Sequence, residues 1–363
     1  MCSSKVILLI LGICSVFGDQ LPISQNSIPA HPTSPAGSIP PHPTTSLSST
    51  PPQAILPPGS LPIGVLAPIN SEVVSQIDLS RVPNIPVKLP GTGTCPGICK
   101  PDGCENCWES CGICKRPTDI WSCPMANNLG LTFDDGPGDD TPKLLDILAA
   151  EGVKATFCVI GVLLQSPKHA ETMRRIYKEG HTICSHTWSH PHLMSLTNEQ
   201  IVSEMKATED IIIKTIGVKP RYLRPPFGEV DDRVRAVVEA MGYKVLMWNL
   251  DTLDWKFWQT NASAIGDSIN QNLASTANPT RSWVTLMHDI YSASVSQVPG
   301  MIRTAKSMGL ELQSAGQCLG DSWVPVQVST REVHSTSSSP KLLTYEIWTI
   351  SIIYVIFSSI VVD

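Results

Sequence analysis

Short apolar runs alternate with amphipathic segments between Leu129 and Met308. The runs predict buried strands, and the segments between them have the apolar spacing of helices that bury one face. Strands are expected at 129–133, 155–160, 182–185, 222, 244–248 and 282–287. Repeated strand–helix units favour a parallel sheet, open or closed into a barrel, with its chemistry at the carboxyl ends of the strands.

Residues that begin and end helices occur at matching positions. Thr197-Asn198-Glu199-Gln200 is a capping box, and Gly217 ends the helix that it begins. Thr141 and Pro142 are read as the N-cap and first residue of another helix. Helices are expected at 141–151, 167–179, 197–216, 232–241, 264–273 and 298–308.

The first 18 residues have the pattern of a signal peptide. Lys5 precedes the apolar run Val6–Phe17, which is too short to span a membrane. Val16 and Gly18 are small enough for a cleavage site. Residues 1–18 are therefore predicted to direct secretion and to be removed.

The C-terminal end predicts a glycosylphosphatidylinositol (GPI) anchor. Small residues at 335–339 precede a polar spacer and the apolar run 347–362, which is the order of a GPI attachment signal. We expect a linker at 321–339, attachment at Ser335 or Ser337, and removal of 340–363. A plain membrane span is the alternative, but the basic cytoplasmic flank that usually accompanies one is missing.

Composition divides the remaining N-terminal region in two. Residues 19–90 are predicted to form a linker or stalk, because their proline, serine and threonine content leaves little apolar surface to bury. Residues 91–124 hold seven of the 12 cysteines. After a signal peptide, this spacing favours disulfides over a zinc site. Seven is odd, and Cys123 with Cys318 is a candidate pair that would close the two ends of the strand–helix region, although spacing alone does not determine connectivity.

Two motifs at predicted strand ends carry candidate metal chemistry. In Thr132-Phe133-Asp134-Asp135-Gly136-Pro137, neighbouring strand side chains point to opposite sides, so the two carboxylates suit two tasks. His186 and His190 follow another strand, where at most one helical turn would face both toward one centre. Two imidazoles and a carboxylate make a metal site with open positions. Zinc fits it because zinc activates water near neutral pH, although iron uses similar ligands.

Three further motifs lie at predicted strand ends. The prolines of Arg224-Pro225-Pro226-Phe227-Gly228 make a rigid loop that can aim a backbone N–H at an oxyanion, although a plain turn with a surface arginine is the alternative. The other two motifs are Asp251-Thr252-Leu253-Asp254-Trp255 and Leu286-Met287-His288-Asp289. A metalloprotease is not indicated, because no His-Glu-x-x-His run occurs.

These five motifs, in this order, resemble those of the polysaccharide deacetylase family (carbohydrate esterase family 4, the NodB homology domain) over about 125–320. The resemblance implies an α/β fold, a deformed (β/α) barrel of about seven strands, here with a disulfide-rich N-terminal preface. It also implies a divalent metal, Zn²⁺ or Co²⁺, held by Asp135, His186 and His190, with Asp134 as general base.

The resemblance assigns roles to the other motif residues as well. Arg224 would orient Asp134, and the backbone N–H of Phe227 would bind the oxyanion. His288 would be the general acid, with Asp254 as its carboxylate partner and Asp251 as the rival for that role. The acetyl pocket would be walled by Trp255 and Leu286.

The resemblance extends to substrate and location. With its signal peptide, cysteine-rich segment and GPI pattern, the chain is most similar to fungal family members that deacetylate chitin. It implies a monomer that is anchored to the plasma membrane or cell wall and converts chitin to chitosan and acetate. Asn261 begins the one acceptable glycosylation sequon. A net charge of -6 disfavours nucleic acid as a partner. The alternatives are a carbohydrate-binding wall protein with weak turnover and a deacetylase of another acylated polysaccharide.

Overall fold

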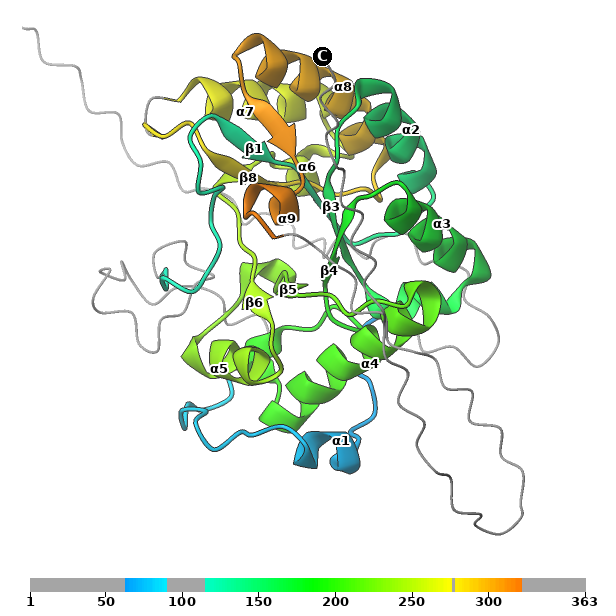
Figure 1. Cartoon of the computed structure of the whole chain (residues 1–363), viewed down its shortest axis with the longest axis vertical. Helices are drawn as coiled ribbons and strands as arrows, with labels where there is room; N and C mark the ends of the chain where they lie inside the picture. Colours follow the sequence, from blue (N-terminus) through cyan, green and yellow to red (C-terminus); the bar gives the residue numbers. More distant parts are fainter. Residues whose placement is uncertain (1–62, 90–114, 276–277, 322–363) are drawn as a thin grey trace, which may run out of the picture. The chain divides into compact units, whose positions relative to one another are not determined.

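The computed structural model in Figure 1 describes residues 63–89, 115–275 and 278–321, all within the compact unit Thr50–Asp363. Several expectations lie outside these residues: the signal peptide, the stalk up to residue 62, the cysteines of 91–114, and the C-terminal tail with Ser335 and Ser337. No helix in the described part of the chain has the length and apolar character needed to cross a membrane.

Two parallel sheets form the centre of this unit. One has the order β2-β3-β4-β5-β6, with strands at Thr132–Asp134, Thr156–Val159, Thr182–Ser185, Tyr222–Leu223 and Lys244–Val245. The other has the order β7-β8-β1-β9, with strands at Leu250–Asp251, Trp283–Leu286, Asn128–Gly130 and Glu311–Gln313. The sheets meet where Thr132 N donates to Thr285 Oγ1 at 2.9 Å and a bridge joins Asp134 to His288. The strands from β2 round to β8 therefore form a deformed barrel, as expected.

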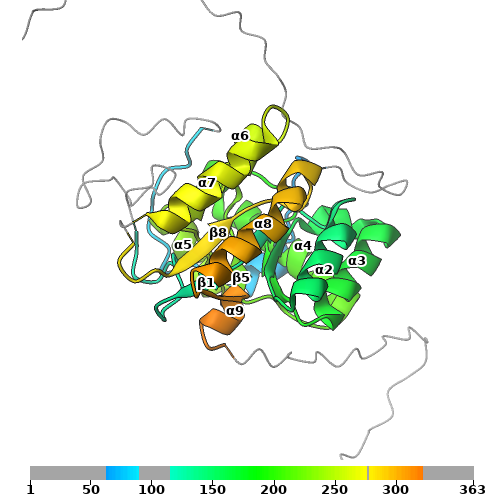
Figure 2. The same cartoon turned by 90° about the horizontal axis from the view of Figure 1, so that it is seen from above.

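Helices pack side by side in the order α7, α8, α2, α3, α4, α5, and Figure 2 shows α8 between α7 and α2. Their bounds are α2 Thr141–Glu151, α3 Pro167–Lys178, α4 Asn198–Ile216, α5 Asp232–Ala240, α7 Ala262–Ala274 and α8 Ser292–Ser307. Shorter pieces are α1 Ser71–Ser75, α6 Asp254–Phe257, α9 Ala315–Cys318, η3 Gly161–Gln165, η4 Leu193–Ser195 and η5 Pro226–Gly228. The capping box at Thr197 is confirmed, and Gly217 ends α4 with a φ of 76°.

The apolar faces of these elements bury two main clusters. The larger one joins the central strands to α2, α3, α7 and α8, through residues such as Phe133 and Leu148. The second lies between β6, α4 and α5, around Met205 and Val237. In strands β1 to β5 the side chains on both faces of the sheet are buried, as expected of parallel strands that helices cover.

Several boundaries differ from the expectations, and the single strand expected at 129–133 is two short strands, β1 and β2, which lie in different sheets. Helix α8 begins at Ser292 rather than 298, because Val295 and Val298 are buried and bring an extra turn onto the core. Pro299 lies inside that helix rather than near its start. Thr141 is the first residue of α2 and the N-cap is Asp140. Strands β7 and β9 and helices α6 and α9 escaped prediction because runs of two to four residues carry no periodic signal.

The disulfide between Cys123 and Cys318 is confirmed. Its Cα atoms are 5.4 Å apart across a separation of 195 residues, so it joins the two ends of the barrel domain. Both cysteines are buried beside β1 and α9. Cys158 and Cys184 are buried free thiols at paired positions of β3 and β4.

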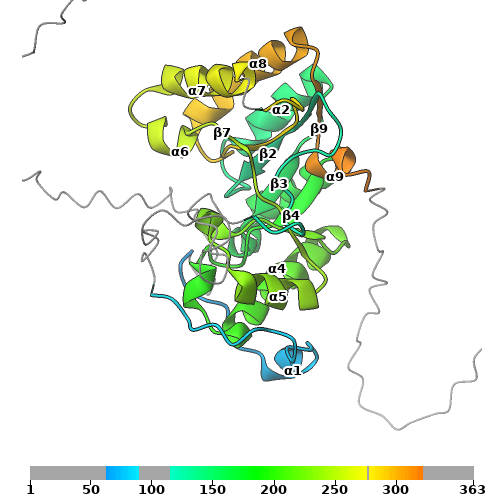
Figure 3. The same ribbon diagram turned by 90° about the vertical axis from the view of Figure 1, so that its left-hand side faces the viewer.

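Part of the predicted stalk is packed against the barrel domain. Residues 63–89, which we call the strap, include α1 and cross α4 and α5, as Figure 3 shows. Val73, Val74 and Ile77 pack against the α4–α5 cluster. The stalk expected over 19–90 therefore does not include residues 63–89. Composition missed the strap because its few apolar residues find their partners far away in the sequence.

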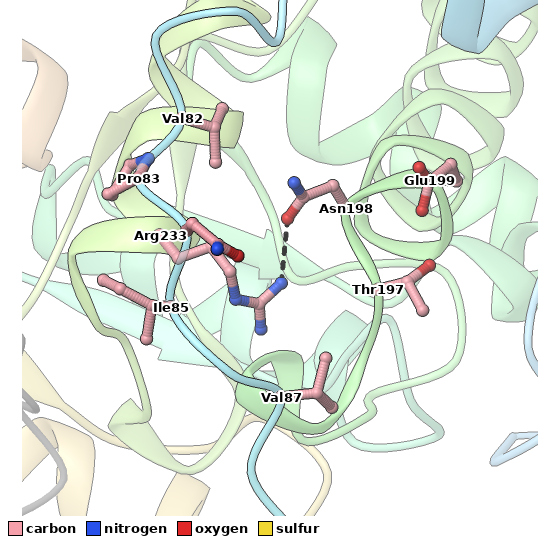
Figure 4. A pocket seen from close by; sticks show the side chains of 9 residues that line it. Val82, Pro83, Ile85, Val87, Thr197, Asn198, Glu199 and Arg233 are labelled. Atoms are coloured by element: carbon pink, nitrogen blue, oxygen red, sulfur yellow. Dashed lines mark hydrogen bonds between the residues drawn. The ribbon is translucent and has the colours of Figure 1, made fainter.

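A pocket of about 290 Å³ lies where the strap crosses the start of α4. Figure 4 shows Arg233 at its centre, donating to Asn198 Oδ1 at 2.9 Å. The lining comes from the strap, the start of α4 and Arg233 of α5, and it includes none of the residues predicted to carry chemistry. We therefore assign this pocket to the packing of the strap rather than to the candidate active site.

Candidate active site

The first carboxylate pair lies where β2 ends. Asp134 is the last residue of the strand, and Asp135 follows with a left-handed backbone at φ 75°. This reversal turns the two carboxylates toward different partners. Gly136 is required next, because a Cβ atom there would collide with the buried carboxylate of Asp289.

Asp135, His186 and His190 come together as candidate metal ligands. The Oδ1 atom of Asp135 lies 3.3 Å from His186 Nε2 and 3.4 Å from His190 Nε2. Ligand atoms of all three residues lie within 4.8 Å of one another. The expected helical turn is absent, since Thr187 and His190 have left-handed backbones at φ 67° and 59°. An irregular loop, rather than a helix, faces the two rings toward one centre.

The protonation states of the three candidate ligands suit the binding of a cation. His186 Nδ1 lies 2.6 Å from the carbonyl oxygen of Arg224, to which a protonated Nδ1 donates, so the lone pair of Nε2 is directed toward Asp135. Burial lowers the pKa of His190 to about 4, which favours its neutral form. Burial would raise the pKa of Asp135, but the facing histidines outweigh burial and lower it below its usual range. Asp135 Oδ1 is buried and accepts no hydrogen bond from any described residue, so these donors fit a divalent metal.

Asp134 is held from one side only. The fully buried guanidinium of Arg224 donates to Asp134 Oδ2 at 3.1 Å and to Thr132 Oγ1 at 3.0 Å. The other oxygen, Asp134 Oδ1, is buried and has no partner among the described residues. One carboxylate oxygen is thus fixed by a cation, while the other is left to accept a proton.

His288 is paired with Asp254 on the opposite side of the site. Its Nδ1 lies 2.8 Å from Asp254 Oδ1, and its backbone N–H donates to Asp254 Oδ2 at 2.8 Å. Burial lowers the pKa of His288, but Asp254 outweighs burial and raises it to about 10. Asp251, the rival partner, instead accepts from Leu253 N at 2.8 Å and from the indole N–H of Trp255 at 3.3 Å.

The remaining predicted residues differ in their exposure and in the groups that they contact. Phe227 has a φ of 59°, and its half-exposed ring stacks on His192 with the centroids 3.9 Å apart. Trp255 is exposed at 49%, while Leu286 is buried at 7%. Asn261 is exposed at the N-cap of α7, where its side chain accepts from Ala264 N at 3.3 Å.

Sequence reasoning missed several residues that support the site. His192 lies outside the five motifs, yet it stacks on Phe227 and lies 2.8 Å from Glu229. Thr132 Oγ1 accepts a hydrogen bond from Arg224. Glu204 accepts one from the loop between His186 and His190, which we call the histidine loop. A threonine in a strand gives no sequence signal of a functional role. A glutamate on the buried face of a predicted amphipathic helix does give such a signal, because a buried carboxylate needs partners.

In sequence and in structure, the chain is similar to polysaccharide deacetylases. A model of the polysaccharide deacetylase family matches residues 122–246. The chain is 33% identical over 208 residues to a chitin deacetylase of Colletotrichum lindemuthianum. This match covers 56% of this chain and 84% of that relative. The solved structure of the chitin deacetylase from that fungus matches with a TM-score of 0.54 at 32% identity, over 56% of this chain and 92% of that one.

A longer match has a limited span. The chain is 36% identical over 310 residues to chitin deacetylase 1 of Cryptococcus neoformans var. grubii. That match covers 78% of this chain and 64% of the relative, so the chain spans slightly less than two thirds of the relative's length.

Proposed function

The chain belongs to the polysaccharide deacetylase family, and from that premise we propose that it hydrolyses the N-acetyl groups of N-acetylglucosamine residues in chitin, giving chitosan and acetate. The observation that carries the proposal is one site that brings together three groups: a carboxylate bonded through one oxygen only, two histidines that face a second carboxylate, and a histidine paired with the buried Asp254. Amide hydrolysis needs a base for the attacking water and an acid for the leaving amine, and the site offers both.

Asp135, His186 and His190 would hold the divalent metal, Zn²⁺ or Co²⁺. When bound, the metal polarises the amide carbonyl and lowers the pKa of water. The free oxygen Oδ1 of Asp134 takes a proton from the attacking water, and Arg224 keeps the carboxylate aimed. A new C–O bond forms, and the backbone N–H of Phe227 donates to the resulting oxyanion. His288 then protonates the amine as the C–N bond breaks, and Asp254 stabilises its charged form.

Features of substrate contact and location belong to the same proposal. Trp255 and Leu286 form the walls around the acetyl group, and Asn261 is a glycosylation site. The signal peptide pattern and the fungal relatives support secretion to the cell wall or cell surface. The GPI pattern around Ser335 and Ser337 supports anchoring there.

Acetate release from chitin oligomers tests the function directly. We expect the secreted chain to release acetate, to lose this activity after chelation and to regain it with Zn²⁺ or Co²⁺. The same chain treated with chelator already saturated with metal is the control. A folded, metal-loaded chain that releases no acetate from chitin oligomers would favour another acylated polysaccharide or a carbohydrate-binding role.

A further inference from the structure

The loop that joins the two ligating histidines holds an unfavourable backbone. Thr187 and His190 both lie in the left-handed region, which residues other than glycine seldom adopt. Such conformations persist only where the surroundings hold them. The position of the His190 ring therefore depends on groups outside the loop.

Other elements bind every carbonyl oxygen between the two histidines. The carbonyl of Thr187 accepts from Gly161 N at 2.9 Å, and that of Trp188 accepts from Val162 N at 3.0 Å. The carbonyl of Ser189 accepts from Gly64 N at 3.0 Å. Helix η3 thus supplies two of these donors and the strap supplies the third.

One carboxylate on α4 binds the amides of the same loop. Glu204 Oε2 accepts from Trp188 N at 3.0 Å and from Ser189 N at 2.9 Å. Glu204 Oε1 accepts from Ser189 Oγ at 3.1 Å and from Ala67 N of the strap at 2.8 Å. The carboxylate is fully buried, and no ion pair within the described ranges involves it. Its oxygens face N–H and O–H donors of the loop and the strap.

We infer that Glu204 is a positioning residue for the metal centre and that the strap acts on the centre through it, in addition to the direct hydrogen bond from Gly64 N to the carbonyl of Ser189. The carboxylate binds the middle of the histidine loop and also binds the strap. A shift of the strap would therefore change the position of the His190 ring. The inference rests on the proposed metal site. It adds that residues 63–89, expected to be only a stalk, help to form that site.

Metal affinity tests the role of Glu204 in the full secreted chain. In Glu204→Gln a single acceptor oxygen remains, so the loop and the strap can no longer both be satisfied. We expect Zn²⁺ and Co²⁺ to bind about 10- to 100-fold more weakly, measured by competition with a chromophoric chelator. The visible spectrum of the Co²⁺-loaded variant should change as well, because the ligand geometry changes. Asp210→Asn, which removes an exposed carboxylate from the same helix, should bind both metals as the wild type does.

A milder variant keeps the test decisive if Glu204→Gln does not fold. Ser189→Ala removes one donor to Glu204 Oε1 and should weaken Co²⁺ binding several-fold. A purely structural role would lower the melting temperature but leave the dissociation constant and the Co²⁺ spectrum unchanged, and that result would overturn the inference. A wild-type chain that binds neither metal would contradict the proposed function itself.

The part played by the strap has its own test. Ala67→Pro removes the N–H that binds Glu204, so it should weaken metal binding too. If the strap acts through Glu204, combining Ala67→Pro with Glu204→Gln should weaken binding no more than Glu204→Gln alone. Additive effects of the two substitutions on the dissociation constant would overturn this part of the inference.

Discussion

At the residue scale, different neighbours distinguish the proposed proton acceptor, Asp134, from the proposed proton donor, His288. Asp134 Oδ2 accepts from the buried guanidinium of Arg224, which holds this carboxylate in place and leaves Oδ1 free to accept a proton. His288 faces Asp254, which stabilises the imidazolium. The neighbours of each group therefore match the base and acid roles that we propose for them.

Substitutions that remove either group test this division. We expect Asp134→Asn and His288→Ala each to lower kcat for acetate release by roughly 10²- to 10⁴-fold, because an amine is a poor leaving group unless it is protonated. Asp251→Asn is the matched control, since the hydrogen bonds of Asp251 go to Leu253 N and Trp255 while His288 pairs with Asp254, and it should keep kcat within a few-fold of wild type. His288→Ala with most of its turnover intact would rule out the assigned acid.

At the element scale, a buried carboxylate begins α5. Asp231 Oδ1 accepts from Val234 N at 2.9 Å, and Oδ2 is buried without a hydrogen-bond partner in the described part of the chain. Burial raises the pKa of Asp231, although the Val234 N–H and the nearby Arg233, Arg235 and Lys88 oppose this. Asp231 thus caps the helix at an electrostatic cost.

The sign of the resulting pH dependence follows from linkage. The unfolded chain releases this proton near pH ~3.9, while the folded chain keeps it to higher pH, so this contribution to stability falls as pH rises through that window. Asp231→Asn keeps an acceptor for the cap and does not titrate. We expect the variant to gain stability over wild type from about pH 4 to pH 7, measured by urea unfolding at several pH values. A stability difference that does not vary with pH would contradict this account.

The strap also has a measurable effect at this scale. Its apolar side chains cover the α4–α5 cluster, which would otherwise meet water. A chain that starts at Gly91 should melt roughly 5–10 °C below one that starts at Thr50, as followed by circular dichroism. Both chains lack residues 1–49, so the comparison isolates the region that contains the strap. Equal melting temperatures would show that the strap contributes nothing to stability.

At the scale of the whole described unit, a disulfide joins the two ends of the barrel domain. The Cys123–Cys318 disulfide closes 195 residues of chain, so it restricts the unfolded state strongly. Replacing both cysteines by serine should lower the free energy of unfolding by roughly 2–5 kcal/mol, measured with urea. Cys158→Ala, which removes a buried thiol that forms no disulfide, controls for lost packing. A double variant as stable as that control would contradict the bracing role.

The sequence by itself determined the local features of this protein. The capping box at Thr197, the helix end at Gly217 and the strand at Thr182–Ser185 depend on neighbouring residues, so local reasoning found them. The five motifs were recognisable for the same reason, since each is a short run at a strand end. A parallel sheet then brings strand ends together whatever the detailed register is.

Tertiary structure alone decided which distant groups meet. It turned the histidine loop without a helix and bound that loop to Glu204 and the strap. These contacts depend on how α4, the strap and the strand ends pack against one another. Their partners lie from 15 to 137 positions apart in the chain, beyond the reach of any local pattern.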